Sequence, residues 1–423
     1  MLEQSILQNY LDILREELVP ATGCTEPIAI AYCAATLREL LGALPEQVDA
    51  AVSGNILKNV KSVVVPNTGG RKGIAPAIAV GLVAGDAARD LQVISAVTEK
   101  QLAELDAYLQ RVEISVSCSH SPCQLDIDLR GSCGSHTARV RITNHHTNIV
   151  CLERDGEVLR ELPVVDSAEE HRADKSLLNV ADILRFAAEV PFEDLLPLLE
   201  PQVSCNSAIA EEGLRGAWGA QIGRILLEDY GDDIKQRAKA YAAAGSDARM
   251  SGCEMPVVIL SGSGNQGITA SVPVWRYGKL MGASEEKILR AVCLSDLITI
   301  HQKTGIGRLS AYCGAVSAGV GAGCGIAWLR GADYDAISHT LENAVAMISG
   351  CICDGAKASC ASKIAMGVEC GLLGYNMYLG GNNFQPGHGI MGKDVEDTIR
   401  HVGVLAAQGM RETDRVILKI MTE

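Results

Sequence analysis

A stretch of 21 residues without a charged side chain, 309–329, limits most strongly what this chain can fold into. Its sequence is LSAYCGAVSAGVGAGCGIAWL, in which Gly, Ala, Ser and Cys outnumber the large apolar residues. A helix of this length, rising 1.5 Å per residue, would be long enough to cross a bilayer. The scarcity of large apolar side chains favours burial inside a protein instead, because a helix that is small or apolar all round must be covered. We therefore expect a tightly packed internal helix rather than a membrane span.

The first 45 residues have the spacing of apolar side chains that is typical of helices. Apolar residues recur at intervals of three and four between Leu2 and Leu18. A second helix is expected to begin at Pro27, since proline suits the first helical position, and this makes Glu26 its cap. The loop VPATGCTEP, residues 19–27, connects the two helices.

Between residues 46 and 165 the pattern changes to short runs that are typical of strands. These runs are β-branched or alternate apolar with polar residues, and turn residues separate them. We expect helices at 74–83 and 99–109 in the same region. The predicted strands are 60–65, 112–116, 125–129, 138–142 and 148–152. The acidic segment 166–176 is interpreted as a linker.

Helical periodicity dominates the rest of the chain. We expect helices at 181–190, 213–229, 285–304, 334–349, 362–377 and 393–408. A chain of 423 residues is also long enough for two cores. The predicted fold is therefore an α+β N-terminal domain, residues 1–170, followed by a mainly α-helical catalytic domain, residues 171–423.

Charge and composition exclude several classes of function. The net charge is −14 and no Lys/Arg run is interleaved with aromatic residues, so we expect no nucleic-acid partner. The N-terminal helix carries acidic residues and lacks the pattern of an export signal, which predicts a cytoplasmic protein. The 15 cysteines should then be reduced. Four of them lie among apolar or small residues and are expected in the core: Cys33, Cys293, Cys324 and Cys370.

Three other cysteines could hold a metal. Cys353 and Cys360 are seven residues apart, which on a continuous helix would separate their Cα atoms by about 10.5 Å. A shared metal site therefore requires a non-helical turn, for which Asp354 and Gly355 are suited. Cys313, which follows the basic residue Arg308, supplies a third thiol, and three ligands would leave one position open for substrate. The alternative is that all three are buried core thiols.

Other segments could bind or activate a substrate. Cys24 lies just before the helix expected at Pro27, where the helix dipole lowers a thiol pKa, although Glu26 opposes this effect. SGSGNQGI, residues 261–268, could form a nest of N–H groups for an anion, but it lacks the Walker and dinucleotide spacings. PNTGGRKG, residues 66–73, is similar. The histidine of HTN, residues 146–148, more often serves as a hydrogen-bonded polar group than as a ligand.

Seven motifs together resemble one known family. They are ATGCTEP at 21–27, HTNIV at 146–150, SDARMSG at 246–252, SGSGNQGITA at 261–270, RLSAYCGA at 308–315, ICDGAKASCA at 352–361 and the closing TDRVILKIM. In this order they resemble the L-cysteine desulfidase family, a branch of the iron–sulfur-dependent L-serine dehydratase superfamily. The resemblance covers almost the whole chain.

This resemblance implies a [4Fe–4S] cluster bound by Cys313, Cys353 and Cys360, with the fourth iron open to substrate. It also implies that Cys24 takes part in catalysis, for which we expect it to act as the base. The reaction would be a β-elimination without pyridoxal phosphate that converts L-cysteine and water into pyruvate, ammonia and hydrogen sulfide. The residues expected to bind substrate or to tune charge are Ser263, Gly264, Asn265, Gln266, Gly267, His146, Thr147, Asn148, Lys303 and Arg308.

The sequence departs from the serine dehydratases in two ways, and three other functions are possible. The chain ends ILKIMTE and so lacks the C-terminal cysteine that caps the open iron in some serine dehydratases. The C-x6-C spacing is shorter than in the serine enzymes, which favours the cysteine branch, but an L-serine dehydratase is the alternative. Other possibilities are a pyridoxal-phosphate lyase with Lys303 or Lys357 as Schiff base, and a non-catalytic metal or redox sensor. A homodimer is expected, because glycine-rich helices often bury against a partner.

Overall fold

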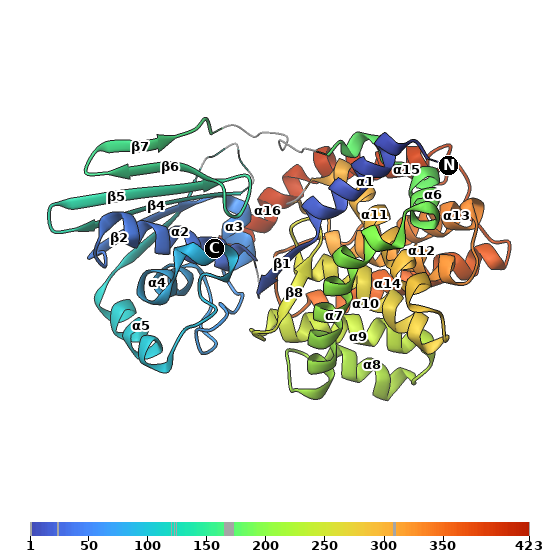
Figure 1. Ribbon diagram of the computed structural model, residues 1–423, viewed down its shortest axis with the longest axis horizontal. Helices are drawn as coiled ribbons and strands as arrows, with labels where there is room; N and C mark the ends of the chain where they lie inside the picture. The colour runs from blue at the N-terminus through green and yellow to red at the C-terminus, as the bar shows by residue number, and fades with distance from the viewer. Residues whose placement is uncertain are drawn as a thin grey trace.

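The computed structural model describes residues 2–22, 25–119, 121, 123, 125–164, 173–307 and 310–422. Two parts lie beside each other: a sheet layered with helices, and a larger part built almost entirely of helices (Figure 1). The expected order, an α+β region followed by a mainly helical region, is confirmed. The division into residues 1–170 and 171–423 remains a prediction.

The N-terminal part is built around a mixed six-stranded sheet with the strand order β3-β2-β4-β5-β6-β7. β2 and β3 are parallel and the other neighbours are antiparallel. The elements of this part are α2 (Thr25–Leu41), β2 (Gln47–Val52), α3 (Gly54–Val60), α4 (Ile74–Ala84), the 3-10 helix η1 (Ala87–Gln92), α5 (Glu99–Arg111), β3 (Ile114–Cys118), β4 (Asp126–Cys133), β5 (His136–Thr143), β6 (Ile149–Arg154) and β7 (Glu157–Glu161).

Apolar and polar residues alternate along the strands, and the apolar side chains form the core of this part. Ile127 and Leu129 of β4 and Val140 of β5 are fully buried, while the charged residues between them line the opposite face. On that face Asp128 and Arg139 form a bidentate ion pair, at 2.9 and 2.8 Å. α2 and α4 cover the apolar face of the sheet (Figure 1). One side of the sheet is therefore a core and the other is polar, as is usual for antiparallel sheets.

The helical part includes the beginning and the end of the chain. α1 buries Tyr10 against Phe186, with ring centroids 5.3 Å apart, and β1 pairs with β8. Its elements are α1 (Gln4–Glu17), β1 (Val19–Thr22), the 3-10 helix η2 (Lys175–Leu177), α6 (Val180–Glu189), α7 (Phe192–Arg215), α8 (Ile222–Tyr230), α9 (Ile234–Met250), β8 (Pro256–Ile259), α10 (Gly264–Leu280), α11 (Glu285–Ile306), α12 (Gly314–Leu329), α13 (Tyr334–Ile348), α14 (Cys360–Leu379), α15 (Val395–Val404), the π-helical turn η3 (Leu405–Gly409) and α16 (Arg411–Thr422).

α12 is the buried internal helix that its sequence predicts. It packs closely on α14, because a Cβ on Gly319 would lie 2.3 Å from the carbonyl carbon of Gly367. A Cβ on Gly323 would similarly lie 2.4 Å from the Cα of Gly371. The glycines therefore serve close helix contact. None of the described helices is both long and apolar enough to cross a bilayer.

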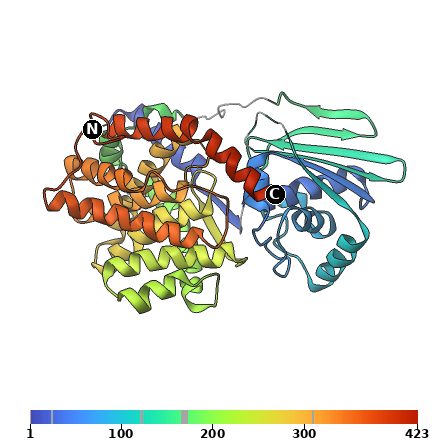
Figure 2. The same cartoon turned by 180° about the vertical axis from the view of Figure 1, so that it is seen from behind.

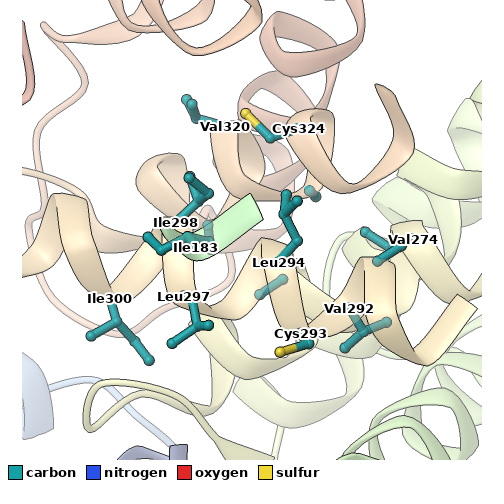
Figure 3. Close-up of a cluster of buried hydrophobic side chains, with 14 of the residues drawn as sticks. Ile183, Val274, Val292, Cys293, Leu294, Leu297, Ile298, Ile300, Val320 and Cys324 are labelled. Carbon is teal, nitrogen blue, oxygen red and sulfur yellow. The ribbon is translucent and has the colours of Figure 1, made fainter. Parts of the chain in front are cut away.

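The core of the helical part lies where α11 meets its neighbours. Leu294 and Ile298 of α11 lie close to Val320 and Cys324 of α12 (Figure 3). Four cysteines expected in the core are buried, which confirms that prediction: Cys33, Cys293, Cys324 and Cys370.

Several expected elements differ from the structure. Residues 60–65, predicted as a strand, contain the end of α3 and the turn after it, and Ser53 caps this helix by accepting a hydrogen bond from the Ile56 N–H. Local capping thus outweighs the β-branched valines. The helix predicted at 213–229 is interrupted between α7 and α8. The strands β2 and β7 and the helices α7 and α9 were not expected, and two internal prolines of α7 obscure its helical pattern. Residues 166–172 of the expected linker lie outside the described residues.

The last helix returns to the N-terminal part. α16 extends from the helical part and ends beside α3 (Figures 1 and 2). Asp414 forms an ion pair with Lys58 of α3, and Leu418 lies against Gly54, the first residue of that helix. The C-terminal helix thereby links the two parts of the molecule.

Candidate functional site

A pocket of about 90 Å³ lies where the two parts meet. The N-terminal part contributes the start of α2 and the end of α3 to its wall. The helical part contributes the ends of α9 and α11, the start of α10, and the segments that carry Cys313, Cys353 and Cys360. The three thiols expected from the sequence therefore line one small cavity.

A short antiparallel contact brings two of these thiols together. Tyr312 and Ile352 form an isolated β-bridge, in which the Cys313 N–H donates to the Cys351 carbonyl (3.1 Å) and the Cys353 N–H donates to the Ala311 carbonyl (2.6 Å). Residues opposite each other in such a pair carry side chains on the same face. The backbone pairing thus places Cys313, Cys351 and Cys353 next to one another.

Cys360 reaches the pocket through the non-helical turn that the sequence predicts. The chain between Cys353 and Cys360 is irregular, with Gly355 at φ +95°, and α14 begins only at Cys360. A Cβ on Gly355 would lie 2.4 Å from the Lys58 carbonyl oxygen, so only glycine fits here without a shift. Lys363 of α14 fastens the turn by donating to the Ile352 carbonyl (3.0 Å) and to Asp354 Oδ1 (2.6 Å).

Burial and contact with one another shift the pKa values of the thiols. Burial raises the pKa of Cys353, and it raises the pKa of Cys360 to about 11. A hydrogen bond to Cys351, together with burial, holds the pKa of Cys313 well above its usual range. The same thiol–thiol contact lowers the pKa of Cys351 to about 7. Thiolate ligands at the other three positions thus require a cation that displaces their protons.

The donor set is of the kind that iron–sulfur clusters use, three cysteine thiols that line one pocket. Within the described ranges, no group of three or more His, Cys, Asp or Glu side chains converges on one metal position. In an iron–sulfur cluster each cysteine binds a different iron, so the ligands surround a cavity rather than meet at one point. Cys313, Cys353 and Cys360 all line the pocket.

The glycine-rich segment expected to form a loop is the beginning of a helix. Gly264 to Gly267 form the first turn of α10, after Ser263 at the cap, so the predicted nest is corrected to a helix N-terminus. The helix can start here because Gly267 packs against β8, where a Cβ would lie 2.1 Å from the Val258 carbonyl oxygen. The N–H groups at the start of a helix still favour an anion. Ser263, Asn265 and Gln266 line the pocket.

The start of α2 also differs from expectation. The helix begins at Thr25, so Glu26 lies in its first turn rather than at its cap. Glu26 Oε1 accepts from Asn59 Nδ2 (3.0 Å) and Glu26 Oε2 accepts from the Thr25 hydroxyl (3.1 Å). These bonds join α2 to α3 within the pocket wall, and all three residues line it. Cys24 and Arg308, both expected in the site, lie outside the described residues.

Among the remaining expected residues, Lys303 lines the pocket but the HTN motif does not. Lys303 is 5% exposed. His146, Thr147 and Asn148 lie in the turn between β5 and β6, where Asn148 Nδ2 donates to the Thr143 carbonyl (3.1 Å). They are not among the described residues of the pocket wall. The segment 66–73 also lies outside this wall.

Sequence reasoning missed three polar residues of the pocket, Lys58, Asn59 and Arg249. Lys58 and Asn59 lie on α3, close to the region expected to be a strand, and they reach the pocket only through the packing of the two parts. Arg249 could have been found, because it lies inside the motif SDARMSG, and a charged residue beside small ones near a glycine is a usable signal.

Comparison with known proteins identifies the family of this chain. Residues 88–419 match the serine dehydratase alpha chain family. A UPF0597 protein of Desulfitobacterium hafniense is 52% identical over 98% of this chain and 96% of its own length. UPF0597 proteins of Lachnoclostridium phytofermentans and Treponema denticola are 49% and 44% identical, over 98% and 99% of this chain and 99% of their own lengths. The chain therefore belongs to the serine dehydratase alpha chain family.

Proposed function

We propose that this protein is an L-cysteine desulfidase, a lyase that converts L-cysteine and water into pyruvate, ammonia and hydrogen sulfide. The observation that carries the proposal is the meeting of Cys313, Cys353 and Cys360 in one small pocket whose wall also holds a helix N-terminus. The family described above supports a dehydratase-type elimination.

Cys313, Cys353 and Cys360 would hold a [4Fe–4S] cluster. When bound, it supplies a Lewis acid that stabilises the negative charge developing on the substrate. The protein contributes the positions of the three sulfur atoms, fixed by the 312–352 bridge and by the start of α14. Lys363 adds a positive charge beside all three thiols, which favours their thiolate forms.

The start of α10 would bind the substrate carboxylate. Its first-turn N–H groups and the Asn265 side chain offer hydrogen bonds in the direction favoured by the helix dipole. Lys303, together with Arg308, would add positive charge to the site. These contacts would hold the substrate with its Cα–H bond fixed relative to the base.

Cys24 is proposed as that base. It is the sequence neighbour of Thr25, which lines the pocket. Its thiolate would take the Cα proton, the electron pair would form the Cα–Cβ double bond, and the Cβ–S bond would break to release sulfide. The proton taken by Cys24 leaves with the sulfide as hydrogen sulfide. The aminoacrylate tautomerises to an imine, which one water molecule hydrolyses to pyruvate and ammonia.

The direct test uses protein purified without oxygen. Iron and acid-labile sulfide are measured first, followed by release of hydrogen sulfide and pyruvate from L-cysteine. Close to four irons per chain with both products supports the proposal. Absence of iron after anaerobic reconstitution, or a bound aldimine that borohydride traps on Lys303 or Lys357, contradicts it.

A variant of Cys24 separates its role from that of the ligands. We expect Cys24→Ala to keep its iron and to lose activity. Loss of iron in this variant would make Cys24 a ligand or a structural residue instead.

The second candidate is an L-serine dehydratase, which the description of the matched family favours. The same cluster and pocket would serve both eliminations. Comparing pyruvate release from L-cysteine and from L-serine at equal concentrations distinguishes them, because kcat/KM is higher for the natural leaving group. The expected homodimer is tested separately by gel filtration, where a monomer of about 45 kDa, the mass of one chain, would contradict it.

A further inference from the structure

Arg249 is a buried cation whose charge is not matched by the protein. It lies near the end of α9, lines the pocket and is 3% exposed. Its Nη1 donates to Asn265 Oδ1 (3.3 Å), but its Nε–H has no acceptor among the described residues. No carboxylate in the described part of the chain forms an ion pair with it. A buried charge without a counter-charge is strongly unfavourable, so this position favours the binding of an anion.

The surroundings of Arg249 indicate where this anion would lie. The guanidinium packs on Gly264, the first residue of α10, where a Cβ would lie 2.3 Å from Arg249 Nε. The guanidinium and the positive end of a 17-residue helix thus act on the same corner of the pocket. Lys58 differs, because Asp414 already neutralises it.

Gln266 has a buried acceptor atom without a donor, whereas Arg249 has a buried donor without an acceptor. It is the third residue of α10, is 4% exposed and lines the pocket, and its Oε1 atom accepts no hydrogen bond from the described residues. Its amide packs against Gly314, where a Cβ would lie 2.8 Å from Gln266 Cδ. The unpaired Oε1 atom of Gln266 therefore lies beside the residue that follows Cys313. Gln266 is two residues along α10 from Gly264, which Arg249 contacts.

We propose that Arg249 and Gln266 form the recognition pair for a free α-amino acid: Arg249 binds its carboxylate and Gln266 accepts from its ammonium group. An α-amino acid carries both groups on one carbon, and the unpaired donor of Arg249 and the unpaired acceptor of Gln266 line the same pocket. A guanidinium binds a carboxylate through paired N–H bonds, so it adds orientation as well as charge. This inference rests on the proposed function, which it deepens by assigning the substrate class to two residues.

The test measures equilibrium binding of two half-ligands by calorimetry, on protein purified without oxygen. 3-Mercaptopropionate has the thiol and the carboxylate but no ammonium, and cysteamine has the thiol and the ammonium but no carboxylate. Because both carry the same thiol, contacts to a metal centre affect them alike. Arg249→Gln should weaken 3-mercaptopropionate binding roughly 10- to 100-fold, as expected for a hydrogen bond to a charged group. Cysteamine binding should be unchanged or tighter.

Two further variants sharpen this result. Gln266→Leu should weaken cysteamine binding roughly 2- to 10-fold, as for a neutral hydrogen bond, and should leave 3-mercaptopropionate binding unchanged. Arg276→Gln is the matched control, since it makes the same chemical change on α10 but its guanidinium stacks on Tyr241 outside the pocket wall. It should change neither affinity.

Equal weakening of both half-ligands by Arg249→Gln would overturn the proposal and make Arg249 a structural residue. Arg249→Lys gives a second measurement if the glutamine variant unfolds, because it keeps the charge and loses the planar fork. An unchanged affinity of Arg249→Lys for 3-mercaptopropionate would contradict paired binding. Binding of the half-ligands needs no turnover. Failure of the reaction with intact selectivity would therefore refute only the proposed function, and turnover without the selectivity would refute only this site.

Discussion

The cysteines of the helical core and those of the pocket differ in the backbone that carries them. Cys293 and Cys324 lie on regular helices, α11 and α12, and are completely buried among apolar side chains. Cys313 and Cys353 lie on a short irregular bridge, and Cys360 lies at the first turn of a helix. Both core thiols are enclosed by side chains of the helical core. The thiols that line the pocket thus lie where regular backbone begins or ends.

The largest expected effect comes from exchanging cysteines in the two regions. Cys313→Ala, Cys353→Ala and Cys360→Ala should each abolish iron retention after anaerobic reconstitution. Cys293→Ala and Cys324→Ala should keep the iron and lose on the order of 1 kcal/mol of stability, because only a small buried group is removed. Iron per chain and urea denaturation check both statements. Iron loss in Cys324→Ala equal to that in Cys353→Ala would remove the distinction between the two regions.

These differences also show what the sequence could predict. The turn between Cys353 and Cys360 and the burial of most of the 309–329 stretch depend on local spacing and composition, so they could be predicted before the structure. The ligand set of Cys313, Cys353 and Cys360 came from the resemblance to a known family and remains a prediction. The position of Arg249 against Gly264 depends on packing between distant segments, which no local pattern contains. Lys58 was missed for the same reason, since it enters the pocket from the other part of the molecule.

Errors in the fold have a similar cause. Residues 60–65 have strand propensity, but the Ser53 cap begins α3 just before them, and propensity is only a weak guide in such cases. Part of the glycine-rich segment expected as a nest, residues 261–268, forms the start of α10, whose glycines allow close contact with β8 and Arg249. Glycine is required at these positions because a side chain would clash with the neighbouring segments, and not because the backbone needs a special conformation. A pattern read one segment at a time does not reveal such contacts.

The core also contains a carboxyl group that should make stability depend on pH. Asp296 of α11 is fully buried, and Gln202 Nε2 donates to it (3.0 Å). Burial raises the pKa of Asp296 to about 8, far above its unfolded value of about 4. The folded protein therefore keeps a proton that the unfolded chain releases between these values. The free energy of unfolding should fall as the pH rises from about 4 to about 8, by up to roughly 1.4 kcal/mol per unit.

Asp296→Asn should remove this slope, because an amide stays neutral across the whole range. Urea denaturation of both proteins at pH 5, 6.5 and 8 measures the difference. The variant should gain relative stability at each step toward alkaline pH. Parallel stability curves for the two proteins would show that Asp296 keeps its charge in the folded protein. The core would then tolerate a charged side chain.

The ion pair between the two parts should contribute less to the free energy of unfolding than the protonation of Asp296 does. Lys58 is 2% exposed and Asp414 is 21% exposed, so Asp414→Asn leaves a buried ammonium without its partner. We expect a loss of about 3 kcal/mol of stability, the lower end for a broken buried pair. Arg415→Gln is the control, because its ion pair with Glu412 is exposed and such pairs contribute under about 1 kcal/mol. Equal effects of the two changes in thermal denaturation would mean that α16 does not hold α3.

A smaller loss of stability than for Asp414→Asn is expected at Gly355, which also tests the difference between the two groups of cysteines. Its φ of +95° and the nearby Lys58 carbonyl oxygen both oppose a side chain, so Gly355→Ala should cost about 2 kcal/mol. Gly331→Ala changes a glycine with φ +90° that has open space around it, so it isolates the cost of the backbone angle alone. Both variants should lose stability, but only Gly355→Ala should also lose iron, because its turn sets the spacing of Cys353 and Cys360. If Gly355→Ala kept its full iron content, the irregular turn would be a consequence of packing against α3 rather than the feature that makes these thiols ligands.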